Sequence, residues 1–567
     1  MTEFLLVFAL AIALGWPLGR YLAAVMRGAP MQGDALFGWI ERPLYRLLGI
    51  DPAQGMDWKA YAKAFLLSNL VLGLLAWLVF MTQAWLPLNP NDAPNMRWDL
   101  ALHTMVSFLT NTNQQHYAGQ AQLSHLAQMT GIVGLQVVTP MMGLALVVAT
   151  LRGFFGGRRK NTTEAQGNGD ADVGNYWADV IRPAVRVMLP LCLLWSVLLT
   201  SQGVPSTLQG GPVATPVDAA AQMGEQKIAV GPVAPMVAAK QLGTNGGGWY
   251  GPNSAVPLEN PTPLSNLLET LAIILIPVSI AFMVGSFTGR RKFTALVFGT
   301  MLAMSLVSAG AALWSESLSG TSTDIAVMEG KEVRFGAAPS ALWAAVTTQT
   351  SNGSVNAMHD SLAPLTGLVT LGNMLVNSIW GGIGCGLQQF LVYLLLSVFL
   401  AGLMTGRTPE LFGRKIEAHE VKLLAVLVLL QPLVLLGLTA LTLAVPAITG
   451  TSNPSFHGIS QVFYEYTSAF ANNGSGFEGL GDATYWWNLS ASLVLALGRY
   501  PALILPLAIA ASLARKRAAP EGPGTLQIET PTFALTLIAV VVILTLLQFM
   551  PVLVLGPVAD HLALIAS

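Results

Sequence analysis

The sequence predicts an all-α, polytopic membrane protein with about ten transmembrane helices. Three observations support this: the composition is apolar, ten segments are long enough to span a bilayer, and four connections between them resemble one another. Of the 567 residues, 53% are hydrophobic and only 10% are charged, against about 25% charged residues in typical soluble proteins. The mean hydropathy is +0.58. This composition argues against a soluble or disordered chain.

The charge balance and the cysteines argue against nucleic-acid-binding and cysteine-based classes of protein. The net charge is −1, whereas a nucleic-acid-binding protein normally carries a basic excess, so we expect membrane lipid and no nucleic acid as surroundings. The two cysteines, Cys192 and Cys385, each lie in an apolar run. That placement argues against a disulfide framework or a CxxC metal site.

Ten segments reach the roughly 20 apolar residues that a transmembrane helix needs. The first begins Met1-Thr2-Glu3, without a basic n-region and without a small-residue cleavage site after it, so we expect a membrane anchor and not a signal peptide. The segments are 4–24, 64–86, 128–151, 185–203, 266–287, 293–315, 378–405, 421–447, 485–513 and 532–556.

Basic residues indicate the orientation of these spans. The connections after the first, third, fifth, seventh and ninth spans hold 22 of the 28 lysines and arginines, among them Arg158, Arg159 and Lys160. Because basic connections favour the cytoplasm, we expect both termini outside. The other basic residues are Arg97, Lys227, Lys240, Lys331 and Arg334 in outer connections and Arg499 inside the ninth span.

Four outer connections share a short helix-compatible stretch followed by small polar residues, at 106–113, 239–246, 346–353 and 467–474. Repeats of this size indicate a repeated architecture. Aligned without gaps, their ends form four layers: Thr110, Gly243, Thr350 and Ala471; then Asn111, Thr244, Ser351 and Asn472; then Thr112, Asn245, Asn352 and Asn473; then Asn113, Gly246, Gly353 and Gly474.

We interpret these segments as pore loops around one axis. Non-helical backbone at membrane depth is tolerated only where it is buried or lines a watery cavity. Glycine allows the angles that turn carbonyl groups toward an axis, and rings of carbonyl oxygens replace the hydration shell of a monovalent cation. No carboxylate lies in the four layers, which argues against a divalent-selective site. The alternative is four solvated loops, because loops are usually rich in Asn and Gly.

The sequence contains no ATP-hydrolysing motif. The segment Gly243–Gly248 lacks the Lys-Ser/Thr of a phosphate loop, and no Asp-Lys-Thr-Gly phosphorylation segment occurs. If ATP drives transport, its hydrolysis belongs to another subunit, and we expect no catalytic residue in this chain.

Few ionisable residues approach membrane depth. Glu269 and Glu465 lie near the outer edge, whereas proton-coupled carriers usually hold such groups near the midplane. The pair His359-Asp360 favours a hydrogen bond that fixes the third loop over a metal site. Arg499 is a functional hypothesis, since a charge inside a span costs several kcal/mol and here would lie below the pore loops. The alternative is that it snorkels or pairs with loop backbone.

Two predicted spans near the pore contain helix-weakening residues. The stretch Gly381–Gly386 lies in the seventh span, and Pro501 and Pro506 lie in the ninth. Broken helices suit a gate, and loose packing without function is equally compatible with them.

Long strings resemble a known family. The string Gly243-Thr-Asn-Gly-Gly-Gly-Trp-Tyr-Gly-Pro-Asn-Ser254, followed by Glu259-Asn-Pro-Thr262, resembles the second filter region of the KdpA family, the potassium-binding subunits of Kdp potassium-transporting ATPases. Further matching strings run through the chain: Thr110-Asn-Thr-Asn113 with Gln115, Val355-Asn-Ala-Met-His-Asp-Ser361, Gly406-Arg-Thr-Pro-Glu410 and Asn472-Asn-Gly-Ser475.

The resemblance implies the fold of the potassium-transporter superfamily. This fold has four pseudo-symmetric helix–pore loop–helix repeats around one central pore, plus one extra helix at each end. The implied parts are 1–63 for the N-terminal helix and its cytoplasmic loop, 64–151, 185–287, 293–405 and 421–513 for the repeats, and 532–567 for the C-terminal helix.

The resemblance also implies a function. Such a subunit binds external K⁺ in its filter and passes it through an intramembrane tunnel to the P-type ATPase subunit KdpB. KdpC and KdpF complete a high-affinity uptake system in the bacterial inner membrane, and no cofactor besides the transported K⁺ is implied. By residue match, Asn111, Thr244, Ser351 and Asn472 supply filter oxygens, Gly246 and Gly474 lie in the next turns, Gln115 lies at the outer filter edge, and Arg499 restrains direct passage to the cytoplasm.

Two positions depart from the family pattern: Asn352 stands where Cys or another small residue is common, and Asn373 lies near a common glutamate. Two other functions are alternatives. A stand-alone K⁺ channel or symporter of the same superfamily shares the filter, but the string 243–262 favours the pump subunit. A membrane enzyme acting on lipid-linked substrates requires His, Asp or Glu clusters at an interface, which the sequence does not indicate.

Overall fold

A computed structural model describes residues 2–31, 33–156, 171–218, 224–317, 328–520, 522 and 525–566. Arg158, Arg159 and Lys160, which enter the predicted orientation, lie outside these residues. Within the described part, ten helices are long and apolar enough to cross a membrane, which confirms the ten predicted spans. They are Thr2–Arg27, Trp58–Trp85, His125–Phe155, Tyr176–Ser201, Pro263–Thr288, Arg291–Ser317, Cys385–Met404, Ala418–Ala444, Tyr485–Arg515 and Pro531–Ile565.

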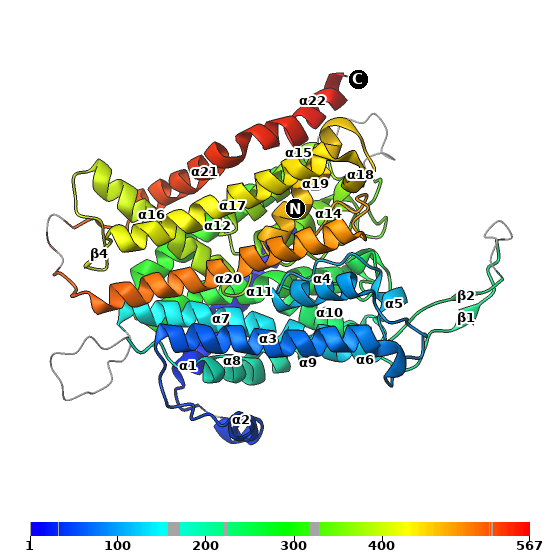
Figure 1. The fold of residues 1–567 in the computed structure, drawn as a ribbon, viewed down its shortest axis with the longest axis horizontal. Helices are drawn as coiled ribbons and strands as arrows, with labels where there is room; N and C mark the ends of the chain where they lie inside the picture. The colour runs from blue at the N-terminus through cyan, green and yellow to red at the C-terminus, as the bar shows by residue number, and fades with distance from the viewer. Residues whose placement is uncertain are drawn as a thin grey trace.

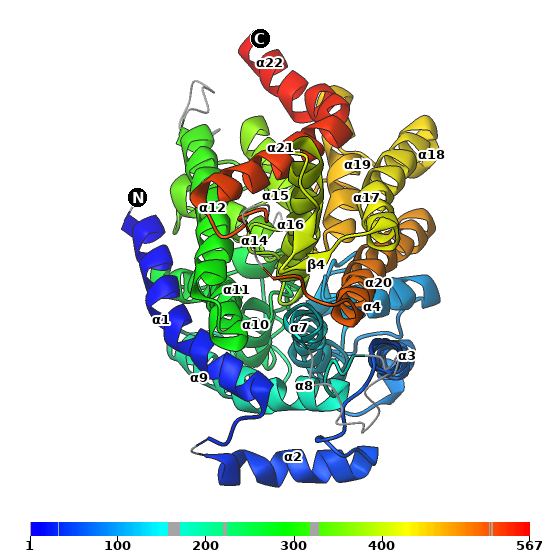
Figure 2. The same cartoon turned by 90° about the vertical axis from the view of Figure 1, so that its left-hand side faces the viewer.

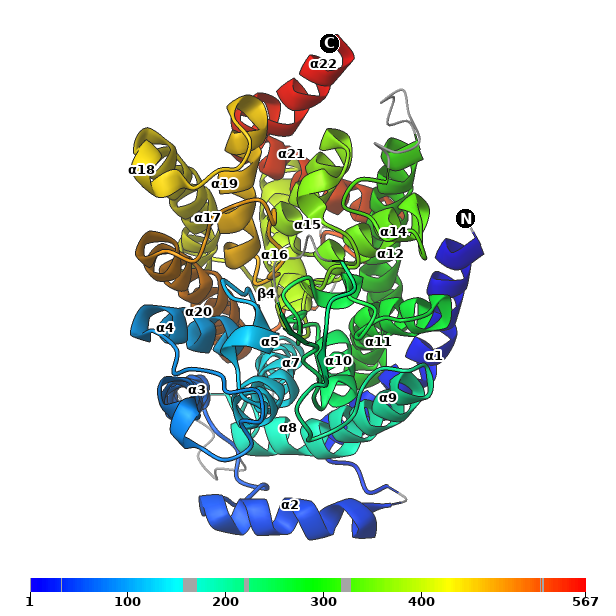
Figure 3. The same ribbon diagram turned by 90° about the vertical axis from the view of Figure 1, so that its right-hand side faces the viewer.

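Four short helices lie at one end of the bundle of long helices (Figure 1). Seen from that end, they surround the centre in chain order (Figure 3). Each ends at the residue directly before the first predicted filter layer, as expected of pore helices. They are α4 (Trp98–Leu109), α10 (Val233–Leu242), α14 (Ala337–Gln349) and α19 (Ser455–Phe470).

Each pore helix lies between an outward and a return segment, so the four predicted repeats are present. The first repeat is α3 (Trp58–Thr82), α4, the π-helical turn η2 (Gln128–Val133) and α7 (Gly134–Phe155). The second is α8 (Tyr176–Pro183), η3 (Ala184–Met188), α9 (Leu189–Ser201), α10 and α11 (Pro263–Thr288). The third is α12 (Arg291–Ser317), α14, α15 (Pro364–Val376) and α16 (Cys385–Met404), and the fourth is α17 (Ala418–Ala444), α19 and α20 (Tyr485–Arg515).

The connections add short elements. These are η1 (Gln83–Trp85), α5 (Gly119–Gln122), α6 (His125–Ala127), β1 (Val213–Ala214), β2 (Gln226–Lys227), η5 (Asn253–Ala255), η6 (His359–Ser361), β3 (Glu410–Leu411), β4 (Arg414–Lys415) and α18 (Pro446–Thr449). The strands form two antiparallel hairpins, β1 with β2 and β3 with β4.

The return segment of the third repeat differs from the predicted span at 378–405. It begins at Pro364, and residues 377–384 between α15 and α16 are not helical. Left-handed Asn377, with φ of 45°, ends α15. Positive φ angles of 62° at Gly381 and 87° at Gly384 suit glycine and keep the following stretch non-helical. By contrast, Pro501 and Pro506 do not interrupt α20, which runs unbroken from Tyr485 to Arg515. The expectation of a broken helix in that span is therefore wrong, and a weakening by proline stays a prediction.

Two further helices flank the repeats, one from each end of the chain (Figure 2). α1 (Thr2–Arg27) packs along α11, where a Cβ at Gly19 would lie 2.4 Å from the carbonyl oxygen of Ser279. Small residues permit such close packing of membrane helices. α21 (Pro531–Leu553) packs against α12, α15 and α16 and continues through η7 (Val554–Val558) into α22 (Ala559–Ala566).

Another helix, α2 (Asp34–Leu48), lies apart from the bundle below α8 (Figure 2). Arg186 of η3 holds it through ion pairs with Asp34 and Glu41. This helix falls in the connection after the first span and is too short and polar to register as a span in the sequence.

Polar and apolar residues are distributed as in a membrane protein with a polar centre. Leu429 and Leu433 on α17 are 64% and 73% exposed, which suits contact with lipid. The polar side chains of the four predicted layers are buried instead. The centre of the bundle, at the ends of the pore helices, is therefore the place where function is to be sought.

Candidate functional site

The four segments that follow the pore helices, 110–113, 243–246, 350–353 and 471–474 (the filter segments), meet around one axis. A Cβ on Gly246 of the second segment would lie only 2.0 Å from the carbonyl oxygen of Asn352 in the third. The same relation links the third segment to the fourth and the fourth to the first: Gly353 to the Asn473 carbonyl and Gly474 to the Thr112 carbonyl, both at 2.1 Å. The fourth link follows the second segment, because a Cβ on Gly247 would lie 2.9 Å from the Cβ of Asn113. The ring therefore closes in chain order.

All four filter segments share one backbone conformation. The second layer has φ of 62° at Asn111, 50° at Thr244, 50° at Ser351 and 53° at Asn472. The fourth layer is again left-handed, with φ of 58° at Asn113, 76° at Gly246, 87° at Gly353 and 105° at Gly474. Left-handed angles are rare for β-branched residues such as Thr244. The same strained conformation occurs in all four segments, so the surrounding structure must hold the backbone in it.

The pore helices fix this conformation through the backbone N–H groups. In the first segment Asn111 N donates to Phe108 O and Thr112 N to Ser107 O, at 3.3 and 3.0 Å. The second, third and fourth segments repeat this: Asn245 N donates to Lys240 O, Asn352 N to Thr347 O and Asn473 N to Ser468 O, at 2.9, 3.0 and 2.9 Å. Each segment therefore uses its donors on its own pore helix.

The carbonyl oxygens are left available by this arrangement. Among the described residues, no hydrogen bond reaches the carbonyl oxygens of Thr112, Asn352 or Asn473. These same oxygens lie against the neighbouring segment. The site thus presents uncharged oxygen atoms around a closed ring, and none of its four layers contains a carboxylate.

Side-chain amides tie the segments to one another. Asn111 Nδ2 donates to Thr244 O, and Asn472 Nδ2 donates to Thr112 Oγ1, both at 3.0 Å. Asn352 Nδ2 donates to Lys240 O at 3.1 Å and Asn473 Nδ2 to Thr347 O at 2.9 Å. We call each pore helix with its filter segment a quarter of the ring. Asn352, one of the two departures from the family pattern, therefore joins the third quarter to the second.

Gln115 clamps the outer continuation of the first segment to that of the second. Its Nε2 donates to Gly248 O at 3.0 Å, and its Oε1 accepts from Gly248 N at 2.8 Å. The string after Gly246, which carries the family resemblance, is thus fixed by the first quarter.

A buried ion pair lies directly behind the second filter segment, and sequence reasoning missed it. Lys240 of α10 has no exposed surface, and its Nζ pairs with Glu259 and donates to Ser254 Oγ at 2.7 Å. From the sequence, Lys240 was only one of several basic residues in the outer connections. The available signal was a lysine inside an otherwise uncharged pore-helix stretch, followed by Glu259 in the matching string.

The non-helical stretch 377–384 packs against the filter. The Thr244 Oγ1 accepts from Ile383 N at 3.2 Å, and Ser351 Oγ donates to Asn377 Oδ1 at 2.7 Å. These are the two left-handed residues of the second layer that are not Asn. The break is therefore a packed support of the strained backbone, not a loosely packed region. Asn373, the other departure from the family pattern, lies nearby and donates to Thr348 Oγ1 at 2.9 Å.

Arg499 lies on the inner side of the filter segments. Leu495, one turn before Arg499 in α20, lies beside the filter, because its carbonyl oxygen accepts a hydrogen bond from Asn472 Nδ2 of the second layer. Arg499 therefore lies one turn further inward. The Arg499 guanidinium donates to Thr139 O at 3.3 Å and to Cys385 Sγ at 2.6 Å, and it is 2% exposed. No carboxylate of the described residues lies within ion-pair distance of it, so it is a buried, unpaired cation. Snorkelling to a surface is excluded by this burial.

His359 and Asp360 each fix the third loop, but through separate partners. His359 Nδ1 lies 3.0 Å from the Tyr464 hydroxyl, and Asp360 Oδ1 lies 2.8 Å from His457 Nε2. His457 Nδ1 also lies 3.0 Å from Asp560 Oδ2. Burial lowers the pKa of His457, but the hydrogen bonds to the two carboxylates outweigh it and raise this pKa to about 9.

Comparison with known proteins extends to nearly the whole chain. The family described as the potassium-transporting ATPase A subunit, KdpA, matches residues 5–562. A potassium-transporting ATPase potassium-binding subunit of Gloeobacter violaceus is 46% identical over 97% of this chain and 96% of its own length. The same subunit of Pseudomonas putida is 44% identical over 99% of this chain and 98% of its own.

Among solved structures, the potassium transporter TrkH of Vibrio parahaemolyticus is similar, with a TM-score of 0.49 and 16% sequence identity. The similarity covers 87% of this chain and 97% of that one.

Proposed function

The chain belongs to the KdpA family, the A subunits of potassium-transporting ATPases, and from this premise we propose that its four filter segments bind the K⁺ that the pump takes up. One observation supports this proposal above the others: the segments form a closed ring with unpaired carbonyl oxygens and no carboxylate. Such oxygens replace the hydration shell of a monovalent cation, whereas divalent-selective sites favour carboxylates.

The bound ion leaves the filter sideways in this proposal. An ion moving straight inward from the filter meets the unpaired guanidinium of Arg499, which stays charged at ordinary pH. The repulsion closes the direct path to the cytoplasm, as a pump requires if it is not to dissipate its gradient. K⁺ then reaches the P-type ATPase subunit through an intramembrane tunnel, and that subunit hydrolyses ATP.

The assembly follows from the same premise. We infer that KdpB is the ATPase subunit and that KdpC and KdpF complete the complex, in the bacterial inner membrane. Both termini lie outside, because most lysines and arginines fall in the connections opposite the pore helices. A stand-alone channel or symporter is not favoured, since the relatives are named as subunits of an ATPase.

The complete complex, reconstituted in liposomes, tests this function. We expect ATP-driven K⁺ uptake by the complex, and no ATPase activity from this chain alone, since it carries no phosphate loop or phosphorylation segment. Replacing Gly246 by Ala adds a Cβ against the Asn352 carbonyl and should impair K⁺ binding. The matched control is Gly437→Ala on α17, where a Cβ meets no atom within 4 Å. Equal K⁺ affinity in both variants would refute the filter assignment.

A further inference from the structure

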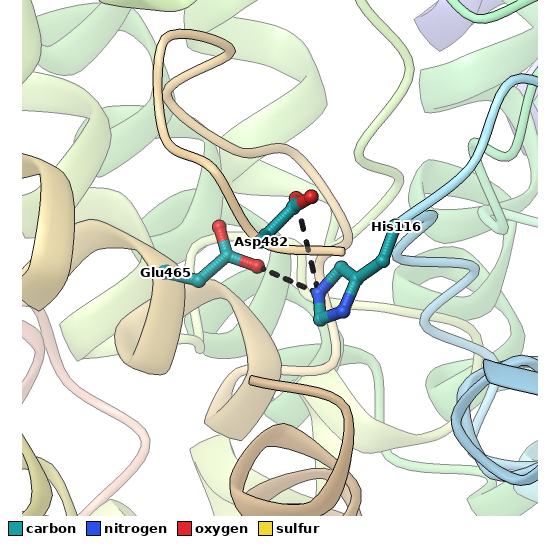
Figure 4. A group of neighbouring side chains, drawn as sticks. All are labelled: His116, Glu465 and Asp482. Carbon is teal, nitrogen blue, oxygen red and sulfur yellow. Dashed lines mark hydrogen bonds and ion pairs between the residues drawn. The ribbon is translucent and has the colours of Figure 1, made fainter. Parts of the chain in front are cut away.

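Three metal-ligating side chains converge beside the first and fourth quarters. His116 lies three residues after the first filter segment, Glu465 lies in α19, and Asp482 lies in the loop between α19 and α20. His116 Nε2 is 3.2 Å from Glu465 Oε1 and 3.9 Å from Asp482 Oδ2 (Figure 4). One ligand atom from each lies within 4.8 Å of the other two. We propose that these three side chains form a Zn²⁺ site at the outer rim of the filter.

Hydrogen bonds around His116 dictate which ring nitrogen faces the carboxylates. Asn488 Nδ2 donates to Asp99 Oδ2 at 2.8 Å, so the Asn488 carbonyl oxygen faces His116 Nδ1, 2.7 Å away. Asp99 is in turn held by Arg97. Nδ1 therefore carries the proton, and in a neutral ring the lone pair of Nε2 points at two anionic oxygens. Either a second proton on Nε2, in an ion pair with Glu465, or a metal ion meets these oxygens, and a histidine oriented through its other nitrogen is typical of zinc sites.

Incompletely partnered buried polar atoms surround the cluster. Gln114 Nε2 donates to Glu465, but Gln114 Oε1 makes no hydrogen bond of ordinary geometry to any described residue. Neither ring nitrogen of His103 does so either. His103 is fully buried, and its ring stacks on His116 with centroids 3.7 Å apart. Gln114 and His103 interact with each other, but outside ordinary hydrogen-bond geometry, so these buried polar atoms retain capacity for a further ligand.

The donor set selects the metal. One imidazole nitrogen and two carboxylate oxygens suit Zn²⁺ with a water as fourth ligand, whereas Ca²⁺ and Mg²⁺ take oxygen ligands. A tetrahedral zinc site places its ligand atoms about 3.4 Å apart, so the observed spacing closes with small side-chain movements. The Asp482 side chain is 29% exposed while His116 and Glu465 are buried, which gives the ion an entry route from the outer face.

Such an ion would join two quarters of the ring. His116 continues the first filter segment, and Glu465 lies two turns before the fourth. The proposal concerns metal binding and the rigidity of this rim, and its readouts do not depend on K⁺ binding by the filter.

Zinc titration of the purified complete complex, stripped with a chelator, tests the site. We expect wild type to bind one Zn²⁺ per complex more than the His116→Gln complex, and Zn²⁺ to raise the melting temperature of wild type only. Asp482→Asn, a near-isosteric change in a partly exposed loop, should weaken this binding at least about tenfold. Asn488→Ala, which removes the acceptor for Nδ1, should weaken it about tenfold with the three ligands intact.

The matched control is His457→Gln. His457 also lies between two carboxylates, but one lies at each of its nitrogens, so neither nitrogen faces two carboxylates as Nε2 of His116 does. Its replacement should leave the zinc stoichiometry and affinity unchanged. Equal zinc binding by wild type, His116→Gln and Asp482→Asn would overturn the proposal, and so would the absence of zinc binding by wild type at micromolar concentrations.

Discussion

The second and third quarters of the filter share a backbone but not its support. In both, a left-handed residue follows the pore helix, and the next N–H groups return to that helix. Behind the second segment lies the buried ion pair of Lys240 with Glu259. Behind the third, the hydroxyl of Thr347 accepts from Gly353 N at 2.9 Å, and Trp343 Nε1 donates to Ser354 O at 2.8 Å.

The comparison distinguishes two roles: the part that binds the ion is the same in both quarters, whereas the part that supports it differs. The repeated backbone presents the carbonyl oxygens, whereas the supports only hold it in place. Changes to the ring itself should therefore affect ion binding most. Changes to the supports should cost stability in proportion to the charge that they leave buried without a partner.

The largest effect on ion binding is expected from Gly246→Asp. Its Cβ would fall 2.0 Å from the Asn352 carbonyl oxygen, and the carboxylate would add charge to an uncharged ring. We expect K⁺ affinity in ATP-driven uptake to fall by about a hundredfold or more, or discrimination against Rb⁺ and NH₄⁺ to relax, about 2.7 kcal/mol at about 1.4 kcal/mol per tenfold. Unchanged affinity and ion ranking would show that the second quarter does not contact the ion.

The next effect is on stability, from Lys240→Met. Glu259 has no exposed surface, so loss of its cation leaves a buried carboxylate, which costs about 3–5 kcal/mol. We expect a marked drop in the melting temperature of the complex, partly recovered in the double variant Lys240→Met/Glu259→Gln. The control is Lys227→Met on the exposed hairpin strand β2, which should have no effect. Failure of the double variant to recover would mean that the lysine acts by packing alone.

Arg499 differs from Lys240 because it is a buried charge without an ionic partner. At an effective dielectric of about 20, two unit charges ~5 Å apart interact by roughly 3 kcal/mol. This corresponds to about a hundredfold in ion occupancy. We expect Arg499→Met to permit passive K⁺ flux in liposomes without ATP, or to weaken the coupling of ATP use to transport. Arg517→Met, in the exposed stretch after α20, is the control. Wild-type flux and coupling in the Arg499 variant would assign this residue a structural role only.

The repeated part of the site could be predicted from the sequence, and the supports could not. Asn and Gly recur at equivalent places because the same left-handed backbone is needed four times. The partners of that backbone come from distant segments: His116 meets Glu465 across 349 residues, and Lys240 meets Glu259 across a loop. No local pattern encodes such contacts.

The fold, too, was predictable from the sequence only in part. Spans with continuous hydropathy were predicted, whereas α15 was missed because 13 residues are too few to register as a span. The prolines of α20 were misjudged because that helix packs closely against α4, α7 and α19, and neighbouring helices allow proline within a membrane helix.

The uncharged support of the third quarter should give a smaller effect than Lys240. Thr347→Val keeps the shape of the side chain but removes the acceptor of Gly353 N, leaving a buried N–H unpaired at a cost of about 1–3 kcal/mol. We expect a modest loss of melting temperature with K⁺ affinity reduced less than in Gly246→Asp. Thr347→Ser retains the hydroxyl and should restore stability. A loss as large as that of Lys240→Met would contradict the proposed ranking of buried charge above buried dipole.

The smallest effect is expected at the outer rim, where the third quarter does have a charged support. His457, at the start of α19, pairs with Asp360 of the third loop and Asp560 of α22, and its pKa is raised to about 9. Because the folded-state pKa lies above the unfolded value of about 6.5, the stabilisation is fully present below about pH 6.5 and is lost as the pH rises through about 9.

Solvent screens this pair, whose histidine side chain is 20% exposed, so its contribution should lie below that of the fully buried Lys240 pair. The measurement is the difference in melting temperature between wild type and His457→Gln, taken from pH 6 to pH 10. We expect wild type to be the more stable at pH 6 and the two to converge at pH 10. A difference that stays constant with pH would mean that His457 supports the rim through its shape and stacking on Phe477, and that charge matters only in the second quarter.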